Sequence, residues 1–113
     1  MTQKRSLTAL AREQLDVARR TSNGRSSQTV FGGHEHTLRQ TVIALVEGQA
    51  LHEHESPGEA TVHVLSGRVQ VSAGQLVWEG SAGDLIIIPN ERHALLALAD
   101  AAVLLTGVNT RTP

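Results

Sequence analysis

The start of the chain has apolar residues at the spacing of a helix. In residues 6–20, SLTALAREQLDVARR, leucines and alanines recur every three or four positions, and basic residues fill the last turn. Ser6 is a suitable N-cap, and Asn23 and Gly24 form a stop signal. This pattern predicts one amphipathic helix that lies against the rest of the domain or against a second subunit.

From residue 28 onward, short apolar runs alternate with turn residues. Strands are expected at residues 28–31, 38–46, 60–66, 68–73, 76–79, 85–88, 94–98 and 102–108, with a further strand carrying His52 and His54. Turn signals arrive about every eight to ten residues, which favours an antiparallel sandwich or small barrel over alternating strands and helices. We therefore expect an all-β fold with one N-terminal helix. Residues 1–27 form the helix and a polar linker, and residues 28–113 form the barrel.

The composition limits the size of the hydrophobic core and the classes of binding partner. A chain of 113 residues is long enough for one domain with a modest core, built here from Val, Leu, Ile and Ala because the only aromatic residues of the Phe, Trp and Tyr type are Phe31 and Trp78. A small core favours support from a partner subunit. The formal net charge of −1 gives no general attraction to nucleic acid or to an anionic membrane.

Two further features of the sequence concern the cellular location of the protein and the side-chain chemistry available to it. The chain has no cysteine, so disulfides and thiolate chemistry are excluded, and any metal must be bound by nitrogen and oxygen. No apolar run is long enough for a signal peptide or a membrane span, so a cytoplasmic location is the expectation.

The richest cluster of possible metal ligands lies in the segment Gly48–Gly67, GQALHEHESPGEATVHVLSG. Residues two apart on an extended strand point to the same face, so His52 and His54 are expected to project side by side. Two histidines and one carboxylate form the facial arrangement of non-haem iron oxygenases, and Glu59 is the carboxylate placed to complete it. The alternative is a solvated hairpin end with exposed histidines.

A second segment, GDLIIIPNERH at residues 83–93, ends an apolar run at Pro89 and follows it with His93. Together the two segments resemble the cupin family of small β-barrels. The positions that match its two motifs are Gly48, His52, His54, Glu59 and Gly67 in the first and Gly83, Pro89 and His93 in the second. The resemblance implies a double-stranded β-helix, or jelly-roll, barrel with a metal held inside it by His52, His54, Glu59 and His93.

One ligand position is open to an alternative. The chain has one residue more between Glu59 and Gly67 than the family pattern, so counting back from the glycine reaches Ala60. In an unbroken strand Glu59 and His63 share a face, so His63 could replace or assist Glu59, whereas a bulge would change this parity. A second H-x-H, His34 to His36, lacks the glycine and glutamate framing. We expect it in a surface turn, the alternative being the barrel mouth with a substrate or second metal.

The resemblance implies a small metal-binding cupin, acting as an oxygenase or isomerase on a small, partly hydrophobic organic molecule inside the barrel. Nitrogen and oxygen ligands admit iron, manganese, nickel, zinc or copper. The alternative is a non-catalytic ligand-binding or metal-binding barrel, such as a sensory module working with a partner protein. Because cupin-like barrels commonly pair, a homodimer is expected, with no nucleic acid and no membrane as partner.

Overall fold

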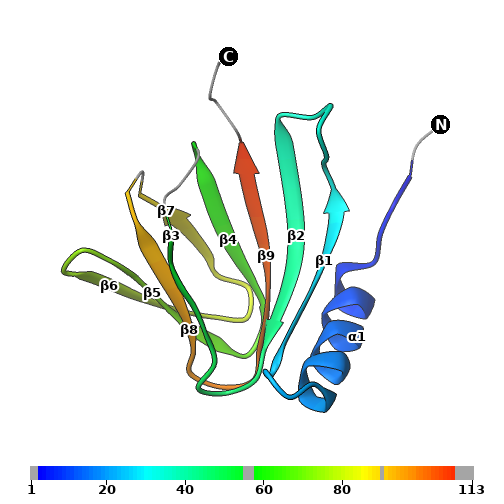
Figure 1. The fold of residues 1–113 in the computed structure, drawn as a ribbon, viewed down its shortest axis with the longest axis horizontal. Coiled ribbons are helices and arrows are strands. Elements are labelled where there is room, and N and C mark those ends of the chain that lie inside the picture. Colours follow the sequence, from blue (N-terminus) through cyan, green and yellow to red (C-terminus); the bar gives the residue numbers. More distant parts are fainter. Residues whose placement is uncertain (1–2, 55–57, 90, 109–113) are drawn as a thin grey trace.

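The protein folds into two antiparallel β-sheets that face each other, with one helix outside them (Figure 1). The computed structural model describes residues 3–54, 58–89 and 91–108. One sheet has five strands in the order β1-β2-β9-β4-β7, and the other has four in the order β3-β8-β5-β6. The elements are α1 (Leu7–Arg20), β1 (Arg25–Phe31), β2 (Leu38–Leu45), β3 (Ala50–His54), β4 (Ala60–Ser66), β5 (Arg68–Ala73), β6 (Leu76–Ser81), β7 (Leu85–Ile88), β8 (His93–Ala97) and β9 (Ala101–Val108). The predicted fold class, an antiparallel barrel with an N-terminal helix, is confirmed.

Helix α1 lies against the outer face of the five-stranded sheet. The hydroxyl of Ser6 accepts a hydrogen bond of 3.1 Å from the backbone N–H of Ala9, which confirms the predicted N-cap. Its buried side chains are Ala11, Leu15 and Ala18, and they pack on small residues of β2 and β9. In the described part of the chain, no helix has both the length and the apolar character needed to cross a membrane.

The first strand begins earlier than the sequence pattern predicted. We expected a polar linker as far as Ser27, but β1 starts at Arg25, and Ser26 and Ser27 already pair with β2. Gly24, with a φ of 65°, turns the chain immediately before β1, and pairing with β2 then holds the polar residues in the strand. The Ser26 hydroxyl then donates a hydrogen bond to the side chain of Gln14 on α1, so a polar residue of β1 pairs with the side of the helix that faces it.

The barrel interior is filled by branched aliphatic side chains from both sheets. Alternation along β4 buries Val62 and Val64, and the same alternation along β5 buries Val69 and Val71. Trp78 of β6 is partly buried and packs against this hydrophobic core. These residues form the predicted core of Val, Leu, Ile and Ala.

Candidate ligand site

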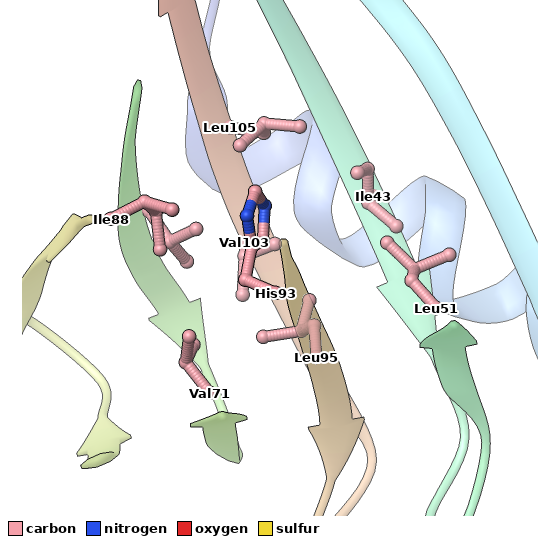
Figure 2. Close-up of a pocket in the computed structure, with 9 residues that line it drawn as sticks. Ile43, Leu51, Val71, Ile88, His93, Leu95, Val103 and Leu105 are labelled. Carbon is pink, nitrogen blue, oxygen red and sulfur yellow. The ribbon is translucent and has the colours of Figure 1, made fainter. Parts of the chain in front are cut away.

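A hollow inside the barrel is lined by apolar side chains and one imidazole. Its cavity volume is about 20 Å³, which is room for about one water molecule. Figure 2 shows the imidazole of His93 in the middle of this lining. The lining residues are Ile43, Leu51, Val62, Val71, Ile88, His93, Leu95, Val103 and Leu105.

The position of His93 follows from strand alternation. Along β8, His93, Leu95 and Ala97 are buried while the residues between them are only partly covered, so the histidine faces the interior. It is 6% exposed and is the buried polar side chain of the described residues. A polar group costs free energy when it is taken from water, unless it finds partners.

A backbone carbonyl orients the His93 ring. Its Nδ1 lies 3.1 Å from the carbonyl oxygen of Glu91, two residues earlier in the chain. The turn that presents this carbonyl is closed by a hydrogen bond of 2.8 Å from the Glu91 N–H to the Pro89 carbonyl. A neutral imidazole that donates from Nδ1 carries its lone pair on Nε2, which is the nitrogen that can accept a hydrogen bond or bind a metal.

The H-x-H strand is irregular beside His93. In the ladder between β3 and β8, Leu51 pairs with Leu95 and His54 pairs with His93, so β3 has one extra residue between these pairs. Leu51 lines the hollow, whereas His52 is exposed. The simple parity that would place His52 and His54 side by side therefore does not apply to this strand. The side chain of His54 lies outside the described part of the structure.

Glu59 and His63 belong to the outer side of β4. Val62 and Val64 are buried in the barrel, and His63 alternates with them, half-buried, opposite Leu85 of β7 and Leu104 of β9. Glu59 has the same parity, is exposed, and accepts a hydrogen bond of 2.8 Å from the Val108 N–H through its backbone carbonyl.

The inner position at this end of β4 is Ala60, which packs against the barrel core. This is the position reached by counting back from Gly67. Glu59 and His63 do share a face, but it is the face turned away from the hollow.

The second H-x-H lies in an exposed turn. The N–H of His36 donates a hydrogen bond of 3.2 Å to the Gly33 carbonyl, and its ring lies 4.7 Å, centroid to centroid, from the ring of Phe31. Both His34 and His36 are exposed, as expected for a surface turn. They do not reach the barrel interior.

The residues that the structure describes include no group of three or more His, Asp or Glu side chains able to hold one metal ion. His52, Glu59 and His63 are not brought to His93. Two observations nevertheless fit a metal ligand at position 93. The Nδ1 of this histidine is oriented by a carbonyl, as is usual for metal-bound histidines, and its Cα ladder partner is another histidine, His54. Among the described side chains, His93 is therefore the one that fits a metal ligand inside the barrel.

The sequence predicted His93 correctly as a site residue, because it follows an apolar run that ends at Pro89. It missed the apolar part of the site, Leu51, Ile43 and Leu105, because these residues come from three different strands whose positions in the barrel depend on long-range pairing. The sequence signal that could have found them is the alternation along β2 and β9. In the structure the same alternation pairs Thr41 with Leu105 and Ile43 with Val103.

The sequence matches no established family profile and no characterised protein. Solved structures do match. A conserved protein of unknown function from Streptococcus pyogenes, SPY1581, is 30% identical, with 81% of this chain and 80% of that chain covered and a TM-score of 0.72. A cupin superfamily protein from Desulfitobacterium hafniense is 15% identical over 96% of this chain and 94% of that one, with a TM-score of 0.76.

A third solved structure extends this agreement over nearly the whole chain. A cupin 2 conserved barrel domain protein from Salinispora arenicola is 15% identical, covers 97% of this chain and 90% of that one, and has a TM-score of 0.68. The strand order, the single helix and these matches agree with the two sequence segments that resembled cupin motifs. The chain therefore has the cupin fold.

Proposed function

We propose that this cupin-type domain binds a small, mainly apolar organic molecule in the barrel, and that His93 orients it. One observation carries the proposal: a buried imidazole faces a hollow whose other lining residues are aliphatic. Small-molecule sites typically combine an apolar lining with a few placed polar groups that fix orientation. The hollow has room for about one water molecule, so its aliphatic walls must move apart to admit a ligand. The chemistry that matches the lining is a compact hydrocarbon body with one hydroxyl or carboxyl group.

The orientation of His93 determines what it can do to such a molecule. With the proton on Nδ1, its Nε2 accepts a hydrogen bond from a ligand hydroxyl. When protonated, the ring instead donates to a carboxylate. The apolar walls exclude water, which strengthens either interaction because the local dielectric constant is low. Binding alone would serve a sensory role with a partner protein.

A thermal-shift and titration experiment tests this function with benzyl alcohol and with toluene, which has a similar body but lacks the hydroxyl. Benzyl alcohol is expected to stabilise the wild type more than toluene does. The His93→Leu variant should lose this preference, and the His63→Gln variant should keep it because His63 lies outside the barrel. Equal binding of both probes to the wild type, or an unchanged preference in His93→Leu, would contradict the assignment.

A second candidate is a divalent transition metal bound through His93 and His54. The pairing of these two residues in the β3–β8 ladder supports it, because it brings their backbones side by side. When bound, such a metal would supply Lewis-acid or redox chemistry, as an oxygenase or isomerase requires. The chain would contribute two imidazoles and a carbonyl that fixes one of them, and the aliphatic walls would bind the body of the substrate.

Elemental analysis tests the metal candidate on tag-free protein purified without added metal or chelator. Near-stoichiometric iron, manganese, nickel, zinc or copper in the wild type, and none in the His54→Ala/His93→Ala variant, would support it. Protein that contains no metal and takes up none on titration would leave binding of an organic molecule as the function of the barrel.

A further inference from the structure

A shallow groove lies beside the barrel hollow, on the inner side of β1. Its volume is about 310 Å³, compared with about 20 Å³ for the hollow. Ile43 of β2 and Leu51 of β3 line both spaces, and Figure 2 shows them beside each other at one side of the hollow. We call this space the β1 groove, and its other lining residues are Asn23, Arg25, Ser26, Ser27 and Thr41. Two aliphatic side chains therefore separate a polar groove from an apolar hollow.

The inner face of the five-stranded sheet changes from polar to aliphatic across these strands. The ladders align two rows of residues from β1 through β2 to β9, which are Ser27–Ile43–Val103 and Thr29–Thr41–Leu105. Both rows begin with a hydroxyl group on β1 and end with a side chain that lines the hollow. Neighbouring strands lie about 4.8 Å apart, so this change extends over roughly 10 Å. A ligand with a polar head and an apolar body matches this change when it lies across the strands.

Arg25 adds a positive charge at the polar end. It is half-buried, and it forms no ion pair with any residue that the structure describes. Its backbone is held in place, because its N–H donates a hydrogen bond of 3.2 Å to Oδ1 of Asn23. The described residues that line the groove include no Asp or Glu. A guanidinium in this setting favours a carboxylate, to which it can donate two parallel hydrogen bonds.

We propose that the β1 groove binds the carboxylate of an aliphatic monocarboxylic acid, whose hydrocarbon body enters the barrel between Ile43 and Leu51. Because this site builds on the proposed function, the barrel still holds the apolar part of the ligand. The hollow alone has room for about one water molecule, and displacing these two side chains joins it to the groove. The carboxyl group then lies at Arg25, and His93 inside the barrel is left to accept a hydrogen bond from a hydroxyl.

Other ligands fit the β1 groove less well. A nucleic acid would need several basic groups along its backbone, and the described lining contains one. A neutral amphiphile would cover Arg25 without compensating its charge, which costs free energy. A small anion such as acetate would leave the aliphatic ends of the two rows unused. An amphiphilic carboxylate satisfies the charge, the hydroxyl groups and the aliphatic walls together.

Calorimetric titration with octanoate and with octanamide tests the site for the carboxylate. The two probes share one hydrocarbon body and differ in the charge of the head group. The wild type should bind octanoate roughly fivefold more tightly than octanamide or better, and Arg25→Gln should bind the two equally. Arg25→Lys should keep a smaller preference, because lysine retains the charge but not the planar fork. The matched control is Arg68→Gln, an exposed position at the start of β5 in the other sheet, which should keep the full preference.

Stopped-flow fluorescence of Trp78 tests the passage into the barrel, since this side chain packs against the barrel core. The rate constant for octanoate association should rise several-fold in Leu51→Ala, because no leucine then has to move aside. Leu85→Ala is the control, because Leu85 is 61% exposed on β7 and should leave the rate constant unchanged. A rate constant that does not change in Leu51→Ala would overturn entry between Ile43 and Leu51.

The titration has three results that would overturn the carboxylate site. These are equal binding of octanoate and octanamide by the wild type, an unchanged preference in Arg25→Gln, and no binding of either probe. Failure of the proposed function is a separate result, seen as equal binding of benzyl alcohol and toluene. Arg25→Gln should retain the preference for benzyl alcohol, because that preference depends on His93 inside the barrel.

Discussion

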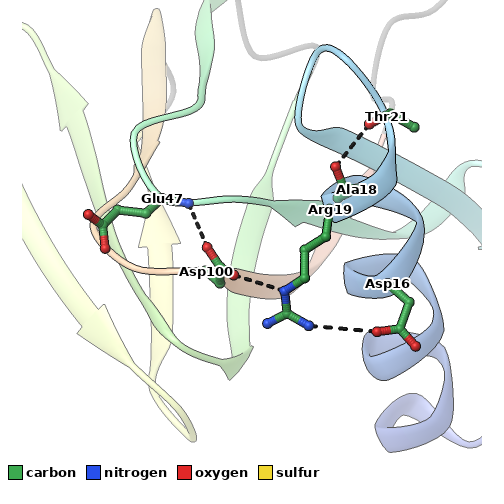
Figure 3. Close-up of polar contacts among 6 residues, drawn as sticks. All are labelled: Asp16, Ala18, Arg19, Thr21, Glu47 and Asp100. Carbon is green, nitrogen blue, oxygen red and sulfur yellow. Dashed lines mark hydrogen bonds and ion pairs between the residues drawn. The ribbon is translucent and has the colours of Figure 1, made fainter.

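Arg19 on α1 donates a hydrogen bond of 2.9 Å from its Nε to Oδ2 of Asp100, which lies between β8 and β9 (Figure 3). The other carboxylate oxygen, Oδ1, accepts a hydrogen bond of 2.8 Å from the backbone N–H of Glu47, in the turn that leads to β3. One carboxylate thereby connects the helix, the turn before β3 and the turn before β9. These are the segments that close the narrow end of the barrel.

Replacing Asp100 with alanine should lower the free energy of unfolding by about 1 kcal/mol, because it removes two hydrogen bonds to a partly exposed charge. Urea denaturation of the wild type and Asp100→Ala measures the difference. The matched control is Asp16→Ala, whose carboxylate lies 3.6 Å from Arg19 on the exposed side of the helix. Its effect should stay below about 0.5 kcal/mol. Equal losses in the two variants would contradict the bridging role of Asp100.

Acid should weaken the same contact. The hydrogen bond from the Glu47 N–H, and then the hydrogen bond and charge of Arg19, hold the pKa of Asp100 below its ordinary value of 3.8, against a small opposing effect of burial. The unfolded chain therefore binds more protons at low pH, and the stabilisation is complete above about pH 5 and lost as the pH falls below the ordinary value. The difference in urea midpoint between the wild type and Asp100→Asn should be smaller at pH 3 than at pH 6. A difference that grows on acidification would contradict this assignment.

Gly67 should tolerate no side chain. Its φ is 77°, and an added Cβ would overlap the carbonyl oxygen of Asp100 and lie 2.7 Å from the Cα of Ala101. Gly67→Ala should lower the free energy of unfolding by about 3 kcal/mol, since left-handed strain and a backbone clash combine. Gly83→Ala is the control, because Gly83 has a φ of 95° but no atom within 4 Å of an added Cβ. Its cost should be limited to about 1–2 kcal/mol of backbone strain, and equal costs in thermal denaturation would rule out the clash.

Most of the fold could be predicted because its signals are local. Ser6 starts the helix through its own side chain, and Gly67 and Gly74 turn the chain between strands with positive φ angles. Alternating valines then decide which face of β4 and β5 is buried. The start of β1 at Arg25 could not be predicted, since its polar residues are held by pairing with β2 and by Gln14 of the helix, which are long-range contacts.

The candidate site was less predictable, because it depends on register. His93 could be identified, since β8 has a regular alternation that places it inside the barrel. The bulge between Leu51 and His54 carries no sequence signal, and it changes which residues of β3 share a face. Glu59 shows the same dependence on register. It is exposed on the outer side of β4, whereas Ala60, one position later, packs against the barrel core.

The ligand set can be tested residue by residue through bound metal. If the barrel holds a metal ion, His93→Ala and His54→Ala should each reduce its content by more than tenfold, since losing one of two imidazoles removes half of the protein ligands. Glu59→Ala and His63→Gln should retain it, because both residues lie on the outer side of β4. Binding requires deprotonated imidazole, so occupancy should fall on acidification. Elemental analysis after equilibration at pH 7.5 and pH 4.5 measures both effects. Metal that persists at pH 4.5, or that is lost in Glu59→Ala while His93→Ala keeps it, would contradict the two-histidine assignment.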